Sequence, residues 1–467
     1  MAYEVVNGTL IPIKEKGQIK KIPLDSIYYR NLTEDYALVI NSFKNKILIV
    51  DASCIRNNML EISEEMEELL VTPTRYPDSF SVDNLYDNQK ILNAYNSIYI
   101  SFAITYSCNL RCSYCFQQQY KSLVRKPITL EELEETLAQI SILISDNPKL
   151  NISFGLFGGE PLLPQNEPII DRIFQYCVEH KIKIDITTNG IFLPFFAKKL
   201  IIHRGIISGI AITVNTLPEN YEEAVKITKV ANNTKKLLKI TQVLLDFGLT
   251  IDVGTNFDRT NIDNLINLFN YFKEHGYFSK SNFFWNIGRV DDRFFDSGYD
   301  DFIVSEVDIL LELIKIRDNI PDNLHAGFIQ TCQNLTDKLG LSFNQRQNKG
   351  IYNYCWNVSP YDRVFYIDNE LNVFRCTVTV GRPEYILGNL KTVDLLNYQH
   401  ETRTFLDNSN CKSCVIGGFC SGGCALSADI DFQKQCSWEL QEFEKFVDLI
   451  LIPEIVSLLG ELNVKSV

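Results

Sequence analysis

The stretch Cys108-Asn-Leu-Arg-Cys112-Ser-Tyr-Cys115 follows an apolar run from Ile98 to Tyr106. Three thiolates this close in sequence can face one point from a loop, which suits an iron-sulfur cluster with three protein ligands and one open iron. A closed zinc site or a complete ferredoxin-type site needs a fourth ligand, and the loop contains none. The alternatives are a zinc loop with a distant fourth ligand, or unrelated core cysteines. The spacing therefore predicts an iron that binds something other than protein.

The composition is that of a globular protein. The 467 residues, 45% hydrophobic and 12% aromatic, predict about two to four domains. A net charge of -13 argues against a nucleic-acid surface, because phosphate binding needs clustered Lys and Arg. We see no secretory signal and no run of the roughly 18 apolar residues that span a membrane, so we expect a cytoplasmic protein without membrane contact. In a reducing compartment the 13 cysteines indicate metal or iron-sulfur ligation.

Residues 1–95 carry a pattern of their own. The runs from Tyr36 to Ile40 and from Lys46 to Val50 are rich in strand-forming residues and predict a hairpin. Ser63 is the expected N-cap of a short helix from Glu64 to Val71. The sequence therefore predicts a small α/β domain at this end of the chain.

Residues 96–325 alternate short apolar strands with amphipathic helices. The clearest helix begins at the capping box Thr129-Leu-Glu-Glu132. Successive β/α units imply right-handed crossovers and a parallel sheet, either doubly wound or curled into a partial barrel, with sites at the carboxyl ends of the strands. The cysteine triplet follows the first strand, where such a site is expected. The expected strands are 98–105, 152–157, 182–187, 210–214, 250–255 and 282–287; the later helices are expected at about 168–180, 193–204, 218–247, 261–275 and 301–319.

A second group of cysteines lies in residues 326–440, ahead of a helix expected over 441–467. The pairs Gly417-Gly418 and Gly422-Gly423 lie among these cysteines, and glycines there let the backbone approach a bulky inorganic cluster. The five histidines lie away from these cysteines in the sequence, which favours iron-sulfur over zinc. Seven cysteines fit two sites better than one: Cys355, Cys376, Cys411, Cys414, Cys420, Cys424 and Cys436.

The C-x3-C-x2-C triplet after the first of several β/α units resembles the radical SAM superfamily. Tyr114 precedes the third cysteine, where the family has an aromatic next to the adenine. Gly158-Gly159-Glu160-Pro161 resembles the motif that contacts the methionine end of S-adenosyl-L-methionine (SAM), and Thr187-Thr188-Asn189-Gly190 lies where the family has groups near the ribose. The resemblance implies a partial (β/α)6 TIM-like barrel and a 4Fe-4S cluster on Cys108, Cys112 and Cys115. The cofactor-binding residues that it implies are Tyr114, Gly158, Gly159, Glu160, Pro161, Thr188, Asn189, Thr213 and Asn256.

Two segments depart from the family pattern. Relatives commonly continue the fourth strand into Ser-x-Asp-Gly, whereas this chain has Thr213-Val-Asn215-Thr. The fifth strand often ends in Arg-x-Asn, and here it reads Gly254-Thr255-Asn256. The groups that bind the SAM carboxylate are therefore not identified by the family pattern, and Arg259 and Lys229 are the candidates.

The second cysteine group resembles the SPASM domain, which carries two auxiliary 4Fe-4S clusters. A family glycine that lies five residues before the second cysteine is replaced here by Leu371. The first auxiliary cluster lacks an obvious fourth thiolate, which leaves an iron open. By position, Cys355, Cys376 and Cys424 are expected to hold the first auxiliary cluster, and Cys411, Cys414, Cys420 and Cys436 the second. The N-terminal domain resembles the RiPP recognition element, which binds the leaders of ribosomally made peptides.

These resemblances imply an enzyme that uses a 5′-deoxyadenosyl radical to modify a precursor peptide, by a thioether or carbon-carbon crosslink. A leader-bearing peptide and an electron donor such as flavodoxin or ferredoxin are the implied partners. The alternatives are epimerisation, backbone excision, or oxidation of a folded protein, as in sulfatase maturases, or of a small metabolite. A non-catalytic iron-sulfur or zinc-binding protein is the alternative from another class. No Ser/His/Asp constellation is present, so no catalytic side chain is predicted.

Overall fold

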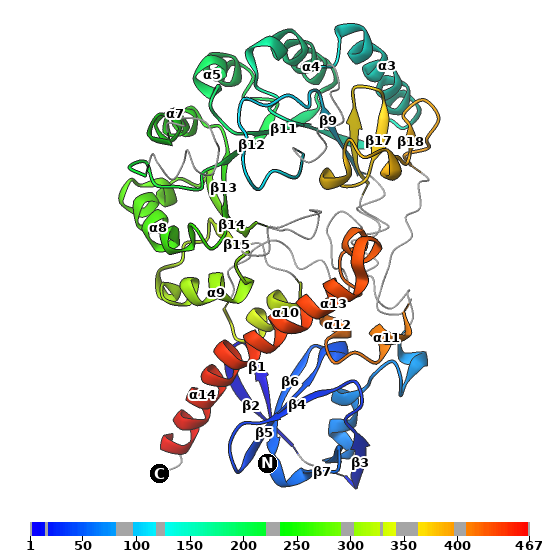
Figure 1. Cartoon of the computed structure of the whole chain (residues 1–467), viewed down its shortest axis with the longest axis vertical. Helices are drawn as coiled ribbons and strands as arrows, with labels where there is room; N and C mark the ends of the chain where they lie inside the picture. The colour runs from blue at the N-terminus through cyan, green and yellow to red at the C-terminus, as the bar shows by residue number, and fades with distance from the viewer. Residues whose placement is uncertain are drawn as a thin grey trace.

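The computed structural model describes residues 2–14, 17–80, 97–117, 127–220, 234–290, 303–326, 330–341, 363–396 and 408–465. Figure 1 shows an arc of strands with helices on its outer side, and a second body of strands around the N-terminus. The C-terminal helices run between the two. The core is continuous, since one cluster of buried apolar side chains includes residues of the arc, of the N-terminal strands and of the C-terminal helices.

The arc is a sheet of ten strands in the order β15-β14-β13-β12-β11-β10-β9-β16-β17-β18. The pairs from β9 to β15 are all parallel, and strands that are neighbours in the sheet follow one another in the chain. A doubly wound sheet needs a point where the strand order reverses, and this order from β9 to β15 has none. The six expected strands are confirmed with shifted ends: β9 (Ser97–Ala103), β10 (Asn151–Phe157), β11 (Lys183–Thr188), β12 (Ile207–Thr213), β13 (Ile251–Phe257) and β14 (Phe283–Arg289).

Helices cover the outer side of the arc (Figure 1). The capping box is confirmed: the Glu132 amide donates to Thr129 Oγ1 at 3.2 Å, and the Thr129 amide donates to Glu132 Oε2 at 2.7 Å. Of the helix expected over 218–247, residues 218–220 are not helical and residues 221–233 lie outside the described residues. The helices are α3 (Leu130–Asp146), α4 (Glu167–His180), α5 (Leu193–Ile202), α7 (Thr234–Asp246), α8 (Leu265–Glu274) and α9 (Glu306–Ile314).

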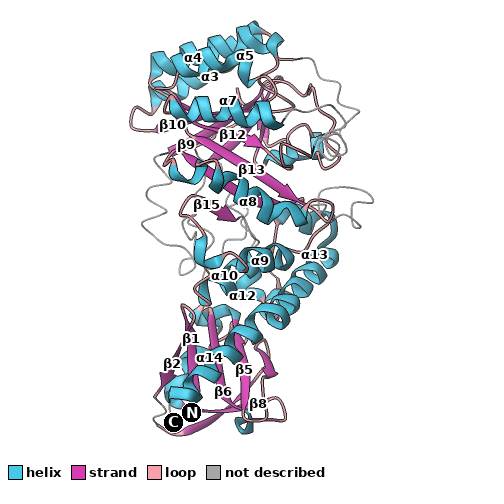
Figure 2. Ribbon diagram, turned by 90° about the vertical axis from the view of Figure 1, so that its left-hand side faces the viewer, coloured by secondary structure: helices cyan, strands magenta, loops and turns pink. Residues whose placement is uncertain are grey.

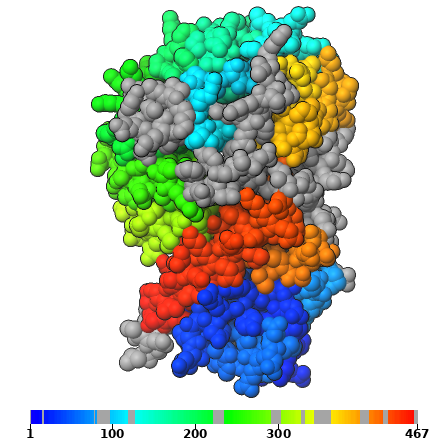
Figure 3. All heavy atoms as spheres, viewed as in Figure 1, coloured from blue at the N-terminus to red at the C-terminus, as the bar shows by residue number. Residues whose placement is uncertain are grey.

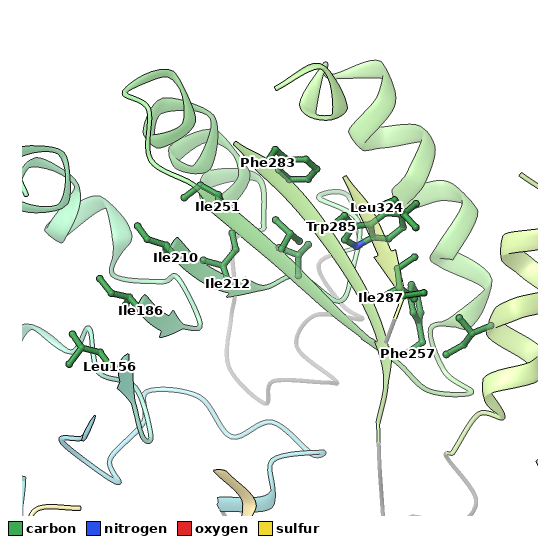
Figure 4. Close-up of a cluster of buried hydrophobic side chains, with 14 of the residues drawn as sticks. Leu156, Ile186, Ile210, Ile212, Ile251, Phe257, Phe283, Trp285, Ile287 and Leu324 are labelled. Carbon is green, nitrogen blue, oxygen red and sulfur yellow. The ribbon is translucent and has the colours of Figure 1, made fainter. Parts of the chain in front are cut away.

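The strands of the arc contribute buried apolar side chains to this core. The Trp285 indole nitrogen donates to Thr255 Oγ1 at 2.8 Å, and that hydroxyl donates to the Val214 carbonyl at 2.7 Å, so the largest buried side chain keeps its polar atom paired. Figure 4 shows Leu156, Ile186, Ile210, Ile212, Ile251, Phe257, Phe283, Trp285, Ile287 and Leu324 on successive strands.

The sheet continues past the first strand into the carboxyl third of the chain. Strand β16 (Val364–Asp368) pairs parallel to β9, and β17 (Asn372–Phe374) and β18 (Gly388–Asn389) follow antiparallel. Leu371 lies in the turn between β16 and β17 with a φ of 63°. This left-handed conformation favours glycine, so the position keeps the backbone of the glycine expected there although its residue is leucine.

The N-terminal body contains two sheets. One has the order β2-β1-β6-β5-β4, and the other β3-β8-β7. The expected hairpin is confirmed, because β5 and β6 pair antiparallel from Tyr36 opposite Asp51 to Asn41 opposite Lys46. The strands are β1 (Ala2–Val6), β2 (Thr9–Ile13), β3 (Ile19–Pro23), β4 (Tyr28–Asn31), β5 (Tyr36–Asn41), β6 (Lys46–Asp51), β7 (Ile55–Arg56) and β8 (Met59–Ser63).

The helix expected after Ser63 is a 3-10 helix, η3 (Glu64–Leu70), and Ser63 makes no side-chain cap hydrogen bond. Residues 2–14 and 17–80 contain no α-helix, so the helix expected from Glu64 to Val71 is present as a 3-10 helix, and residues 81–95 of the expected α/β domain lie outside the described residues. Ser63 is the last residue of β8 and pairs with Ile19. Pro73 follows this helix, and the residue before a proline disfavours the α conformation.

The long apolar runs of β5 and β6 arise because both faces of this sheet are buried. Leu38, Ile40, Ile47 and Ile49 join the main core, and the residues between them join a second core with the three-stranded sheet. Each such side chain stabilises by about 1.5–3 kcal/mol when buried, so exposing all four would cost roughly 6–12 kcal/mol. A typical domain is stable by only about 5–15 kcal/mol, so this face needs a cover.

The cover is the C-terminal helical segment. Figure 2 shows α14 (Ile452–Lys465) lying across this sheet, and Figure 3 shows the C-terminal residues in contact with the N-terminal ones. The helix expected over 441–467 begins earlier, since α13 (Ala425–Phe446) continues into it through a π-helical turn, Val447–Leu451. Pro453, which has no amide hydrogen to donate, follows that turn. Within the described ranges no helix is both long and apolar enough to span a bilayer.

Candidate functional site

A cavity of about 380 Å³ lies at the carboxyl ends of β10 to β14, with the cysteine loop forming part of its wall. This volume is within the range of roughly 300–1,000 Å³ found for small-molecule sites. Glu160 and Pro161 do not line it. The expected residues that do line it are Cys108, Cys112, Tyr114, Cys115, Gly158, Gly159, Thr188, Asn189, Thr213 and Asn256.

Gly158 and Gly159 lie directly against the backbone that leads into the cysteine loop. The Gly159 amide donates to the Thr105 carbonyl at 2.7 Å, and the Glu160 amide donates to the Ser107 carbonyl at 2.8 Å. A Cβ on Gly159 would lie 2.2 Å from the Ser107 carbonyl oxygen, and Gly158 has a φ of +131°. Side chains at either position would displace the loop, so these glycines fix the start of the cysteine triplet.

Glu160 is a buried positioning residue. Its side chain is 1% exposed, and its Oε1 accepts hydrogen bonds from the Leu162 amide at 2.8 Å and the Thr188 hydroxyl at 2.6 Å. Its Oε2 accepts from the Asn189 amide at 2.7 Å. Burial raises the pKa of Glu160, although these hydrogen bonds oppose the shift. The carboxyl group therefore holds the carboxyl end of β11 beside the cysteine loop.

Asn189 connects this network to the first cysteine. Its Nδ2 donates to Asn109 Oδ1 at 2.8 Å and lies 3.7 Å from Cys108 Sγ, which also accepts from the Leu110 amide at 3.4 Å. Burial raises the pKa of Cys108, and it raises the pKa of Cys112 to about 12. Neutral thiols are thus favoured here until a positive partner, such as the irons of a cluster, binds.

Asn215 is a site residue that sequence reasoning did not select. Its Nδ2 donates to the Tyr114 hydroxyl at 2.8 Å, and its Oδ1 accepts from the Asn256 amide at 2.9 Å. This side chain thus ties the cysteine loop to the ends of β12 and β13. The signal was present, because Asn215 stands in the segment where the chain departs from the Ser-x-Asp-Gly pattern.

Arg289, at the end of β14, was also missed. It is the one charged side chain among the described residues that line the cavity. Its Nε donates to Glu306 Oε1 at 3.1 Å, and its guanidinium lies 4.2 Å from the centre of the Trp438 ring on α13. Of the carboxylate-binding candidates, Arg259 does not line the cavity and donates instead to the Ile303 carbonyl, and Lys229 lies outside the described residues.

A second cavity, of about 170 Å³, brings four cysteines together. Burial raises the pKa of Cys420 well above its ordinary value, and the charges of Glu439 and the other three thiolates act in the same direction. Gln435, which is 3% exposed, also lines this cavity, and its Oε1 has no hydrogen-bond partner among the described residues. The cysteines are those expected to form one set: Cys411, Cys414, Cys420 and Cys436.

Part of the other auxiliary set lies near the main cavity. Burial raises the pKa of Cys376, and the charge of Cys424 acts in the same direction. Val378, two residues after Cys376, lines the main cavity. Cys355, the third expected member, lies outside the described residues.

Comparisons with known proteins identify the central part of the chain. Residues 102–272 match the sequence model of the Radical SAM superfamily. The chain contains a radical SAM domain. The predicted resemblance to this superfamily is thereby confirmed for residues 102–272, which include the cysteine triplet and the strands β10 to β13.

One sequence relative and two solved structures illustrate what this chain is similar to. A GTP 3′,8-cyclase of Aquifex aeolicus is 29% identical over 225 residues, which are 46% of this chain and 63% of the cyclase. This chain spans less than two thirds of that relative's length. The solved structure of native anSMEcpe with bound AdoMet has a TM-score of 0.55 at 17% identity, over 78% of this chain and 99% of that one. Streptococcus suis SuiB bound to precursor peptide SuiA has a TM-score of 0.52 at 16% identity, over 88% and 97%. At such identities these likenesses show the fold.

The radical SAM domain implies a 4Fe-4S cluster and SAM, and the main cavity fits both. Among the described residues no three His, Cys, Asp or Glu side chains could share a single metal ion. A cluster does not require that, because each thiolate binds a different iron. Three cysteines on one wall, with hydrogen-bond donors directed at Cys108 Sγ, are suited to such a cluster.

Changing Glu160→Gln tests the positioning network of the radical SAM domain. An amide cannot accept from all three donors, so one nitrogen would face a donor and weaken the support for Asn189 beside Cys108. We expect SAM cleavage to slow by about 10–100-fold, as when groups that orient metal ligands are lost. The matched control is Glu167→Gln at the start of α4, since the Glu167 side chain is 40% exposed and forms an ion pair with Lys199. Equal cleavage rates in the two variants, measured as 5′-deoxyadenosine formed, would refute the positioning role.

Proposed function

We propose that this protein is a radical SAM peptide maturase that modifies a ribosomally made precursor peptide, by oxidative crosslinking. The observation that carries the proposal is the second cavity with Cys411, Cys414, Cys420 and Cys436, which lies beyond the radical SAM domain. A crosslink leaves a substrate radical that must lose an electron, and an additional cluster could accept it. The fold likeness to SuiB, whose structure contains a precursor peptide, extends over 88% of this chain and supports the same assignment.

In this proposal the arc is a partial (β/α)6 barrel, and residues 326–440 form a SPASM domain. The first cluster is held by Cys108, Cys112 and Cys115. The auxiliary clusters are held by Cys355, Cys376 and Cys424, and by the four cysteines of the second cavity. The N-terminal residues 1–95 contribute to peptide binding. The hairpin of the expected peptide-recognition element is present there, whereas its helix is replaced by η3.

In this proposal the residues of the main cavity bind the cluster and SAM and orient the groups that hold them. With SAM bound, the cluster supplies the electron that releases a 5′-deoxyadenosyl radical, which removes a hydrogen atom from the substrate. Gly158, Gly159 and Glu160 fix the cysteine loop and the end of β11. Asn215 orients Tyr114 through its hydroxyl, and the Tyr114 ring would contact the adenine of bound SAM. Arg289, the charged group of the described lining, offers a partner for a carboxylate of the cofactor or substrate.

The experiment is anaerobic reconstitution followed by reaction with reductant, SAM and the short peptides encoded beside the gene. We expect about twelve irons per chain, 5′-deoxyadenosine formation, and a loss of about two hydrogens from a peptide. A peptide of unchanged mass that has taken up solvent deuterium would indicate epimerisation, and a larger loss would indicate backbone excision.

The second candidate is a radical enzyme that acts on a nucleotide, which the similarity to GTP 3′,8-cyclase favours. Parallel reactions with GTP and with the peptides separate the two candidates. Consumption of GTP with no change in any peptide would overturn the maturase proposal. Zinc in place of iron, without visible iron-sulfur absorbance, would overturn both.

A further inference from the structure

The glycine pair Gly417-Gly418, between two cysteines of the second cavity, lies against the N-terminal body. A Cβ on Gly418 would lie 2.4 Å from the Ser42 carbonyl oxygen and 2.5 Å from Phe43 Cα. A Cβ on Gly417 would lie 2.9 Å from Phe43 Cζ and 2.2 Å from the Cys411 carbonyl oxygen. Real Cβ contacts essentially never fall below 3.0 Å. Gly417 also lines the second cavity, so the expectation that the backbone approaches a cluster here stays a prediction. The structure adds a second reason for the pair, because the two glycines admit the backbone and the ring of Phe43.

The N-terminal partner in this contact is a rigid turn. It is η1 (Ser42–Lys44), which joins β5 to β6, and Asn41, Ser42 and Phe43 are fully buried. The Gly418 amide donates to Ser42 Oγ at 3.2 Å. On the other side of the turn, Asn41 Nδ2 donates to the Leu69 and Val71 carbonyls at 3.0 and 2.9 Å, and Asn41 Oδ1 accepts from the Phe43 amide. The turn is thus fixed from both sides.

Two further contacts join the N-terminal body to the helices around the second cavity. The Gly8 amide donates to the Lys338 carbonyl at 3.0 Å, at the end of α10 (Gln330–Lys338). The Tyr28 ring packs edge-on against Phe443 at 4.9 Å, and its hydroxyl donates to Glu444 at 3.1 Å. Phe443 and Glu444 lie on α13, the helix that carries Cys436. The N-terminal body therefore contacts both α12 (Gly417–Cys420) and α13, which provide thiols to this cavity.

We infer that the N-terminal body is the scaffold on which the second cysteine cavity forms. Residues 2–80 and the C-terminal helical segment 408–465 fold as one unit, since the sheet needs those helices as its cover and the cysteine segment needs η1 as its base. The N-terminal body is then not an independently folding peptide-binding domain. A ligand bound to it acts through η1 on the backbone between Cys411 and Cys420.

The inference rests on the proposed function in one respect, namely that the second cavity holds a cluster. The reactivity of the cysteine thiols can be measured in the metal-free protein and does not depend on that cluster. The test compares Gly418→Ala with Gly460→Ala, a control on α14 where an added Cβ meets nothing within 4 Å. In the metal-free full-length chain, iodoacetamide labelling of Cys411 and Cys108 is followed by mass spectrometry. Cys411 is 8% exposed, so it reacts through local opening.

In Gly418→Ala we expect Cys411 to react about tenfold faster than in wild type, with the rate at Cys108 unchanged. After reconstitution we expect a loss of about four irons per chain. Gly460→Ala should match wild type in both measurements. If Gly418→Ala yields too little folded protein, Ser42→Ala replaces it, because it removes the hydrogen bond from the Gly418 amide and adds no atom; the same effect is expected at smaller size.

Wild-type labelling rates at Cys411 in Gly418→Ala, or in its Ser42→Ala replacement, would overturn the inference. So would retention of all iron together with wild-type labelling. Faster labelling in a protein whose wild type never takes up iron at this cavity would support the scaffold and remove the auxiliary cluster from the proposed function. Failure of the scaffold inference and failure of the proposed auxiliary cluster therefore give different results.

Discussion

Replacing Cys108, Cys112 and Cys115 together by Ala is expected to abolish SAM cleavage while the other clusters keep their iron. The three thiols line the main cavity, and Cys411, Cys414, Cys420 and Cys436 line the other one. The iron content should therefore fall by about four per chain, the content of one cluster. Anaerobic reaction with dithionite and SAM, with 5′-deoxyadenosine measured by chromatography, gives the activity.

The control for the triple variant is Cys54→Ala, which removes a thiol from the N-terminal body far in sequence from both cysteine groups. It should keep wild-type cleavage and iron. If cleavage persists in the triple variant, the triplet is not the SAM cluster and the assignment of the main cavity is wrong. If the triple variant loses all of its iron, the two cysteine groups are not independent sites.

Changing Gly159→Ala is expected to reduce SAM cleavage by about 100-fold or more, because a displacement near 1 Å in a catalytic arrangement has effects of that size. The added Cβ would lie 2.2 Å from the Ser107 carbonyl oxygen and 2.7 Å from the Tyr106 carbonyl carbon, both backbone atoms. The loop that begins at Cys108 must then move away from β10. The measurements are 5′-deoxyadenosine formed from SAM, SAM binding by equilibrium dialysis, and iron per chain.

The matched control is Gly209→Ala in β12, where the nearest atom to an added Cβ is Asp185 Oδ1 at 3.5 Å. That distance is an ordinary contact, so wild-type cleavage is expected. Wild-type SAM binding in Gly159→Ala would show that the cysteine loop tolerates the displacement, and that the glycine is not needed to fix it.

Local sequence patterns predicted most of the central sheet. Its strands are short apolar runs, and the capping box at Thr129 begins α3 at the expected residue. The helix after Ser63 lies where it was expected, but it is a 3-10 helix without the expected side-chain cap. Ser63 also pairs with Ile19, a contact between strands that the local pattern does not reveal. Leu371 shows the reverse case: its left-handed backbone is set by the turn from β16 to β17, where Asp368 accepts hydrogen bonds from the Glu370 and Asn372 amides.

Some features of the candidate site were predicted from the sequence, and others required the tertiary structure. The triplet and the Gly158-Gly159 pair are read from sequence, because consecutive residues at a strand end stay together in any fold that keeps the strand. The roles of Asn215 and Arg289 depend on which side chains face them, namely Tyr114 for Asn215 and Trp438 with Glu306 for Arg289. The cofactor contact expected of Glu160 stays a prediction, whereas its hydrogen bonds from the Thr188 hydroxyl and the Asn189 amide depend on the tertiary structure.

The sequence by itself determined the cysteine triplet, the alternation of strands and helices, and the existence of a second cysteine group. Each of these depends on residues close together in the chain. Only the tertiary structure decided that Ser42 and Phe43 pack against Gly417 and Gly418, since the hydrogen bond that joins them spans 376 residues of sequence. The sequence around Ser42 predicts a turn, and Gly417-Gly418 is a glycine pair that allows close approach of another backbone. Neither local pattern indicates that the two segments contact each other. The partner is set by the buried faces of β5 and β6, which need the C-terminal helices as their cover.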